Sequence, residues 1–210
     1  MNTQTLTNQE NVRPTAKYPE TFAEEDVYYS PQIEDEMGET AIHFLLTSEF
    51  FHLLKQFFAS REDVLTAANM MVYFDKGNAR KWLAPDVFVC FGVENKLRKT
   101  YKVWEEDNIF PQVVFEIASE NTVENDLGKK YLDYSHLGVE EYYLLDPERL
   151  LLPSPLMAFQ KNDGCLVAVN VENNRVFSPL MNLEIVNTGK SFRLFNPETK
   201  EFLQAVLTGE

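Results

Sequence analysis

Residues 111–147 read PQVVFEIASENTVENDLGKKYLDYSHLGVEEYYLLDP, and this stretch decides the fold. It opens with an apolar, strand-like run at 112–119 and closes with another at 139–147. Between them, residues 120–138 carry apolar side chains at helical spacing and end at Gly138, a residue type that commonly terminates helices. Because a strand, a helix and a strand in this order form a parallel crossover, the stretch predicts a mixed α/β sheet.

The residues before this stretch extend the same pattern. Residues 39–59 place apolar side chains at helical intervals without Gly or Pro, which predicts a long amphipathic helix packed on a core. Two strand-like runs follow at 64–74 and 85–93, and a turn signal at 75–78 separates them. We therefore expect further strands of the sheet between the long helix and the crossover.

The pattern changes after residue 147. Residues 150–210 contain prolines, turn signals and short Val-rich runs, and a closing hairpin is expected at 192–203. We expect residues 1–19 to be a flexible tail and residues 20–210 to form a single domain, in which 150–210 is a β-rich extension.

Composition excludes several classes of protein. The chain has 210 residues, a hydrophobic share of 44% and a formal net charge of −14. This apolar content predicts a globular core, and two separated cysteines argue against a disulfide scaffold or a zinc finger and favour a reducing cytoplasm. The first residues lack a signal-peptide pattern, and no apolar run is long enough to cross a bilayer. The charge argues against nonspecific coating of nucleic acid, although residues 20–39 hold much of the acid and no Lys or Arg.

Two carboxylates lie in apolar strand-like runs. Asp86 stands at the head of VFVCF, and Glu116 stands inside VVFEIAS. A buried acid is costly unless it is paired or bound to a cation. If the two strands are neighbours, both acids converge, and convergent carboxylates are ligands that Mg²⁺ prefers. The structural alternatives remain open: Asp86 capping a turn, and Glu116 pairing with a buried Arg or Lys.

A lysine of the following helix is the third candidate. Lys130 lies on or beside the apolar face of the helix, where it can orient a water or stabilise phosphoryl charge near the two acids. Its neighbour Lys129 lies on the more polar side, at helical spacing from Asp126 and Asp133. Lys130 also stands four residues after Asp126, so an intrahelical ion pair is compatible with either role.

The most basic stretch is the loop at 95–102. Its cations are either a solvated loop or phosphate contacts beside the site: Lys96, Arg98, Lys99 and Lys102. The three histidines form no HExxH motif and are interpreted as structural or surface groups.

Several motifs together resemble one family, the Uma-two family of restriction-endonuclease-like proteins within the PD-(D/E)XK nuclease superfamily. The resemblance covers roughly residues 36 to 205. The family's PD corresponds to Pro85 and Asp86, and its E-V-x-S corresponds to residues 116–119. Its helix and strand motif corresponds to Asp126, Lys130, Tyr134, Gly138, Val139, Glu141 and Tyr142.

The resemblance implies a restriction-endonuclease-like mixed β-sheet flanked by helices, and a Mg²⁺- or Mn²⁺-dependent endonuclease acting on DNA. Asp86, Glu116 and the backbone carbonyl of Ile117 would hold the metal, and Lys130 would position or help deprotonate the water. The superfamily places its lysine two residues after the glutamate, where this chain has Ala118. The helix lysine is the substitute that the resemblance offers. The superfamily often has a further acid on the first helix, which Glu39 or Glu49 could supply; Glu39, four residues before His43, resembles the family's motif there.

Ala118 and the acidic composition of the chain suggest an alternative function. The protein would then keep the nuclease fold as a nucleic-acid or protein binding module, with weak or no catalysis. The choice between DNA and RNA stays open. Cleavage of both strands generally needs two active sites, which a homodimer would supply.

Overall fold

The computed structural model describes residues 40–205. The predicted tail at 1–19, the acidic segment at 20–39 and the candidate Glu39 lie outside the described residues. Within 40–205, each helix is too short or too polar to cross a membrane.

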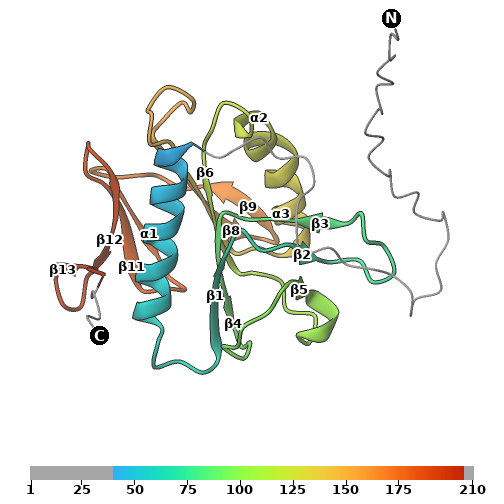
Figure 1. Cartoon of the computed structure of the whole chain (residues 1–210). Helices are drawn as coiled ribbons and strands as arrows, with labels where there is room; N and C mark the ends of the chain where they lie inside the picture. The colour runs from blue at the N-terminus through green and yellow to red at the C-terminus, as the bar shows by residue number, and fades with distance from the viewer. Residues whose placement is uncertain (1–39, 206–210) are drawn as a thin grey trace, which may run out of the picture.

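The centre of the fold is a six-stranded sheet in the order β1-β4-β6-β7-β8-β9 (Figure 1). In that order, its strands span Val64–Ala68, Val87–Phe91, Val113–Ile117, Glu141–Leu145, Leu156–Asn162 and Cys165–Ala168. β6 and β7 pair in parallel, whereas the other neighbouring pairs are antiparallel. The predicted parallel crossover and mixed α/β sheet are confirmed.

The helix that joins β6 to β7 consists of three consecutive segments. They are α2 at Val123–Asn125, a π-helical turn, η3, at Asp126–Lys130, and α3 at Tyr131–Leu137. Gly138 ends the helix with a φ of +92°, the left-handed conformation that favours glycine, and its N–H donates to the Tyr134 carbonyl. The predicted glycine stop is therefore confirmed.

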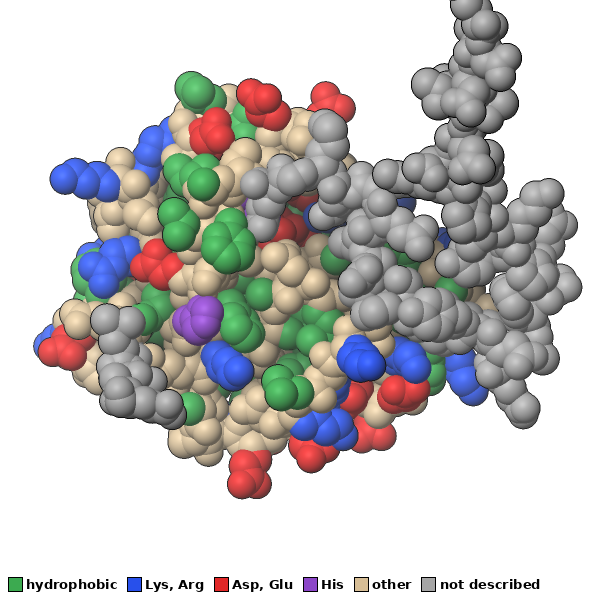
Figure 2. All heavy atoms as spheres, in the orientation of Figure 1, with side chains coloured by type: hydrophobic (Ala, Val, Ile, Leu, Met, Phe, Trp, Pro, Cys, Tyr) green, Lys and Arg blue, Asp and Glu red, His purple; other side chains and the backbone are tan. Residues whose placement is uncertain are grey.

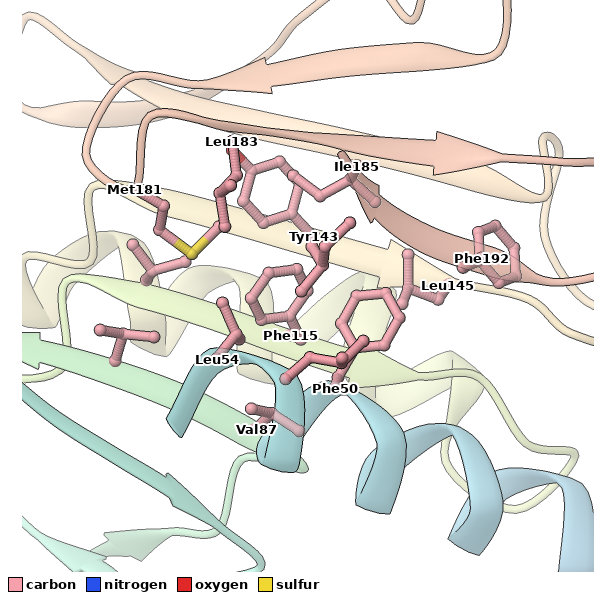
Figure 3. Close-up of a cluster of buried hydrophobic side chains, with 14 of the residues drawn as sticks. Phe50, Leu54, Val87, Phe115, Tyr143, Leu145, Met181, Leu183, Ile185 and Phe192 are labelled. Atoms are coloured by element: carbon pink, nitrogen blue, oxygen red, sulfur yellow. The ribbon is translucent and has the colours of Figure 1, made fainter. Parts of the chain in front are cut away.

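One face of the six-stranded sheet is covered by α1, Ala41–Phe57, and by a second, antiparallel sheet (Figure 1). The second sheet has the order β10-β11-β12-β13, with strands Arg175–Ser178, Leu183–Asn187, Phe192–Asn196 and Glu201–Phe202. Phe50 of α1 meets Phe115 edge-on at 5.4 Å between ring centroids, and Phe115 stacks on Tyr143 at 5.1 Å. Leu183 and Ile185 close this core from the second sheet (Figure 3).

The crossover helix and a small sheet cover the opposite face. The small sheet has the order β3-β2-β5, with strands Trp82–Leu83, Val72–Tyr73 and Tyr101–Lys102, and the short 3₁₀ helix η2 follows at Val103–Glu105. A second apolar cluster joins Tyr134 of α3 to Tyr101 and to Phe88 and Val114 of the central sheet. Strands β4, β6 and β7 at the centre of the sheet are therefore buried on both faces, as their apolar sequences predict.

Alternation along the strands decides which face each side chain reaches. Phe115 belongs to the core on the α1 side, whereas Val114 belongs to the core on the α3 side. Glu116 shares the parity of Val114 and turns toward α3. Glu141 shares the parity of Tyr143 and turns toward the second sheet. Two acids on adjacent parallel strands are thus buried on opposite faces.

The register between β4 and β6 is fixed at one end by a side chain. Gln112, just before β6, accepts from the Phe91 N–H at 2.9 Å and donates to the Phe91 carbonyl at 3.2 Å. The ladder then runs through Val89↔Val113 to Val87↔Phe115. Continuing that antiparallel register by one residue sets Asp86 opposite Glu116.

The sequence predictions locate the elements well and miss one break. The helix expected at 39–59 is observed at Ala41–Phe57, and the hairpin expected at 192–203 forms from β12 and β13. The single run expected at 64–74 divides into β1 and β2. Asn69 has a φ of +48° and donates its N–H to the carbonyls of Pro85 and Asp86, which turns the chain into the small sheet.

Glu141 ties the C-terminal strands to the central sheet. Its Oε2 accepts hydrogen bonds from the Tyr143 hydroxyl at 2.9 Å and from the Ser178 hydroxyl, and its Oε1 accepts from the Leu180 N–H at 2.9 Å. Burial raises the pKa of this carboxyl, although the three donors oppose that shift. The shared core and this anchor lead us to propose that residues 150–205 belong to the same folding unit as the central sheet.

Glu141→Ala should lower the free energy of unfolding by about 2 to 4 kcal/mol, because it leaves buried donors from Ser178, Tyr143 and Leu180 without their acceptor. Urea unfolding followed by far-UV circular dichroism and by tryptophan fluorescence would measure the loss. If the chain is one unit, both signals shift together in a single transition.

Glu148→Ala is the matched control, since Glu148 is an exposed acid in the loop after β7. It should change stability by less than about 0.5 kcal/mol. Two separate transitions in wild type, or an unchanged midpoint in Glu141→Ala, would contradict the proposed single unit.

Candidate active site

Asp86 and Glu116 lie together at one end of the β4–β6 pair. The Oδ2 atom of Asp86 accepts a hydrogen bond from the Ile117 N–H at 2.7 Å, so the side chain of one strand is held by the backbone of the other. The sequence interpretation required that the two strands be neighbours, and they are. Both acids therefore meet on the face that the crossover helix covers.

Glu116 is held by two side chains of that helix. Its side chain is 1% exposed, Oε1 accepts from the Tyr134 hydroxyl at 2.5 Å, and Oε2 lies 3.0 Å from Lys130 Nζ. Both contacts come from the helix face that packs on the sheet. Glu116 therefore has the buried cationic partner that the sequence left open as its structural alternative.

Lys130 bridges Glu116 to a third carboxylate. Its Nζ lies 3.0 Å from Asp126 Oδ1, and the Asp126 side chain is 1% exposed. Asp126 and Lys130 are the first and last residues of the π-turn η3. Turns of this kind inside helices occur frequently at functional sites. The intrahelical pair and the contact with Glu116 coexist, so the two roles that the sequence left open for Lys130 are compatible.

A histidine of α1 reaches the site from the other side of the sheet. His43 Nε2 lies 3.2 Å from Asp86 Oδ2, and the imidazole is 9% exposed. Thr40 caps α1 by accepting the His43 N–H at 3.3 Å, which fixes the first turn of the helix where this contact forms. Interpreting His43 as a structural or surface group did not anticipate a contact with Asp86.

Burial and charge oppose each other in this cluster. Burial raises the pKa of Glu116 well above its ordinary value, and the nearby Lys130 ammonium acts against that rise. Burial also raises the pKa of Asp126. Burial disfavours a charged Lys130, but the carboxylates of Glu116, Asp126 and Asp86 outweigh it and raise its pKa. Lys130 therefore stays protonated, with Glu116 and Asp126 as its ion-pair partners and Asp86 nearby.

The donor set fits a hard divalent cation. Within residues 40–205, no group of three or more His, Cys, Asp and Glu side chains forms a ready cage for a metal. Mg²⁺ does not require one, because it is commonly held by one or two carboxylates and keeps several waters. Asp86 and Glu116 could supply two such ligands, and among residues 40–205 the acids of this cluster outnumber its lysine, which favours an added cation.

The remaining predicted site residues lie elsewhere. Ile117 meets Asp86 through its N–H, and the proposed role of its carbonyl stays a prediction. Lys129 is 73% exposed and pairs with Asp133 at 2.5 Å on the outer side of the helix. Lys129 therefore does not join the cluster in this structure.

The basic loop divides into one structural cation and three surface cations. The Arg98 guanidinium is 6% exposed and pairs with both carboxylate oxygens of Glu106, at 2.7 and 2.9 Å. It also donates to the carbonyls of Glu94 and Lys96, so this structure gives Arg98 a role in holding the loop rather than in reaching a phosphate.

Lys96, Lys99 and Lys102 lie at or near the surface of that loop. Lys96 pairs with Glu94, and Lys102 pairs with Glu105. Lys99 is exposed. On the face shown in Figure 2, lysine and arginine side chains lie among acidic ones, in keeping with the acidic composition.

Three residues of the cluster had not been assigned to the site in the sequence interpretation: Asp126, Tyr134 and His43. The signal for the first two was present, because Asp126, Lys130 and Tyr134 repeat at intervals of four on one helix. For His43 the signals were its place in the first turn of a helix and its four-residue spacing from Glu39, which resembles the family's first-helix motif. The contact with Asp86 depends on how that helix crosses the sheet.

The fold and the site together define an α/β protein with a carboxylate–lysine centre buried at one end of a strand pair. The family model of Uma2, described as "Putative restriction endonuclease", matches residues 27–186. The chain belongs to the Uma2 family, and this membership supports a nuclease function in general terms.

Among solved structures, the chain is similar to a protein from Anabaena variabilis, described as "a putative nuclease belonging to DUF820". The two share 16% sequence identity, with a TM-score of 0.49, over 71% of this chain and 78% of that one. No curated protein matches the sequence.

Lys130→Met should destabilise the fold, because it leaves Glu116 and Asp126 buried without their ammonium partner. The loss at pH 8 should be about 3 to 5 kcal/mol. The pKa values of the two carboxyls already lie above their ordinary values and would rise further, so stability would be retained at low pH and lost as pH rises through them. Urea unfolding at pH 5 and pH 8 measures this difference.

Lys129→Met is the matched control, one residue away on the exposed side of the helix. It should cost less than about 0.5 kcal/mol at either pH. Equal penalties for the two variants would contradict the assignment of Lys130 as the counter-ion of the buried acids.

Proposed function

We propose that this protein is a metal-dependent endonuclease that hydrolyses phosphodiester bonds in DNA. The observation that carries the proposal is the convergence of Asp86, Glu116 and Lys130 from two strands and a helix. Membership of the Uma2 family supports the nuclease class independently. The substrate, the metal and the activity itself are the parts that experiment must test.

Asp86 and Glu116, with the Ile117 carbonyl, would hold Mg²⁺ or Mn²⁺. Bound there, the ion supplies an activated water and neutralises charge on the scissile phosphate. The residues of this chain prepare the site. His43 and the Ile117 N–H orient Asp86, and Tyr134 and Lys130 orient Glu116. Lys130 adds a fixed positive charge next to the place where phosphate charge develops.

The position of Lys130 compensates for the main departure from the superfamily pattern, which is the missing lysine on the strand. Ala118 occupies the place of the usual lysine, is buried, and donates its N–H to the Leu145 carbonyl at 2.8 Å within the sheet. Lys130 reaches Glu116 from the helix instead. A lysine ammonium therefore stands beside the glutamate although the strand does not provide it.

Asp86→Asn and Glu116→Gln should each abolish metal-dependent plasmid nicking. Each removes a charged ligand while keeping the shape of the side chain. We expect a loss of at least about 100-fold, beyond the roughly 10- to 100-fold typical of residues that only support a ligand. Supercoiled plasmid incubated with Mg²⁺ or Mn²⁺ and resolved on agarose gives the rate.

Glu124→Gln, an exposed acid on the same crossover helix, serves as the control and should nick like wild type. Nicking that survives either site substitution would contradict the assignment. A wild type that neither nicks nor binds Mg²⁺ by calorimetry, yet binds nucleic acid or a protein, would support the binding-module alternative instead.

Lys99→Ala should weaken DNA binding nearly uniformly across sequences and reduce the slope of log affinity against log salt by about 1, if Lys99 contacts a phosphate. Fluorescence anisotropy of a labelled duplex with Ca²⁺ in place of Mg²⁺ measures binding without cleavage. Lys190→Ala, in the turn between β11 and β12, is the comparison. An unchanged salt slope in Lys99→Ala would indicate that Lys99 belongs to a solvated loop and does not contact a phosphate.

A further inference from the structure

The buried pair of Asp126 and Lys130 is more than a helix-stabilising contact. Both side chains turn inward from the ends of the π-turn, with exposed fractions of 1% and 14%, and their charged atoms are 3.0 Å apart. Intrahelical pairs on a surface contribute only about 0.3 to 0.5 kcal/mol. Burying Asp126 carries a desolvation cost that such a small gain does not offset.

The same helix contains a pair that shows the ordinary case. Lys129 and Asp133 have the same four-residue spacing, contact each other at 2.5 Å and lie outside the cluster. Helix geometry alone accounts for that pair. Helix geometry does not explain why the Asp126–Lys130 pair is buried in the interior, next to Glu116.

The position of Asp126 is fixed independently of Lys130. Its N–H donates to the Thr122 carbonyl at 2.9 Å, and its own carbonyl accepts from the Tyr142 hydroxyl at 3.0 Å. Tyr142 belongs to β7, so the sheet itself holds the start of the π-turn. Asp126 is therefore a rigid support, whereas Lys130 is a long side chain with several rotatable bonds.

Lys130 contacts two acids with different tasks. Glu116 is a proposed metal ligand, and an oxygen that turns to a cation is less available to an ammonium group. Asp126 lies on the helix, and its Oδ1 lies 3.0 Å from Lys130 Nζ. With two acceptors, Lys130 can give up one and remain in place.

We propose that Asp126 is a positioning residue that holds Lys130 beside the scissile phosphate while Glu116 is engaged with the metal ion. The inference rests on the proposed nuclease function and assigns a task to a residue outside the metal pair. Asp126 acts through Lys130, and it contacts neither substrate nor metal.

The test compares Asp126→Asn, Lys130→Met and the double variant, with Asp133→Asn as the matched control from the exposed pair. Nicking rates measured over a range of DNA concentrations should show a kcat about 10- to 100-fold lower for Asp126→Asn, with KM for DNA unchanged. The double variant should be no slower than Lys130→Met, because the lysine through which Asp126 acts is already gone. Asp133→Asn should match wild type.

Calorimetry with Mg²⁺ alone provides a readout independent of turnover. Asp126→Asn should bind Mg²⁺ within about threefold of wild type, whereas Glu116→Gln should lose binding. A tenfold or greater loss in Asp126→Asn would make Asp126 a metal ligand and overturn the positioning role. Losses that multiply in the double variant, or a wild-type kcat in Asp126→Asn, would overturn it as well.

Failure of the inference can be told apart from failure of the proposed function. If wild type neither binds Mg²⁺ nor nicks DNA, the proposed function fails and the inference falls with it. If wild type is active and only the Asp126 comparisons fail, the inference alone is overturned. Should Asp126→Asn not fold, Asp126→Glu replaces it: a lower kcat with unchanged Mg²⁺ affinity supports the role, and an unchanged kcat contradicts it.

Discussion

A carboxylate inside a sheet that is covered on both faces is the constraint on which the rest of this structure depends. Glu116 sits in the middle layer, where water cannot solvate its charge. Lys130 and Tyr134 occupy its two oxygens, and both come from the helix packed on that face. The crossover helix must therefore dock with its π-turn over β6, and this requirement couples the fold to the chemistry.

The adjacent strand, β7, also buries a carboxylate, but it is stabilised by different partners. Glu141 is also buried, but on the opposite face, where hydroxyl and amide donors hold it and, among residues 40–205, no lysine or arginine forms an ion pair with it. One acid anchors the second sheet, and the other collects a cation and further acids. Burial alone therefore does not mark a catalytic carboxylate. A cluster of further charged groups, as around Glu116, is the more informative sign, and it is the reason that Glu116 is the proposed catalytic acid.

The sequence predicted the parts of the fold that depend on periodicity, and the parts of the site that depend on spacing. Parallel strands, the crossover helix, its glycine stop and the meeting of Asp86 with Glu116 all follow from alternation and order along the chain. The division of one expected strand at Asn69 depended on hydrogen bonds to Pro85 and Asp86, seventeen residues or so away. The contact of His43 with Asp86 depended on a helix crossing angle. Neither is encoded in a local pattern.

The side chain of Gln112 gives the site a reference point for its alignment. By offering an acceptor and a donor to the same residue, Phe91, it imitates the backbone of a paired strand where the ladder would otherwise end. If a neighbouring strand slipped by one residue, every one of its side chains would move to the other face of the sheet. Together with the ladder, the Gln112 amide therefore helps to hold the register that sets Asp86 opposite Glu116, thirty positions apart in the chain.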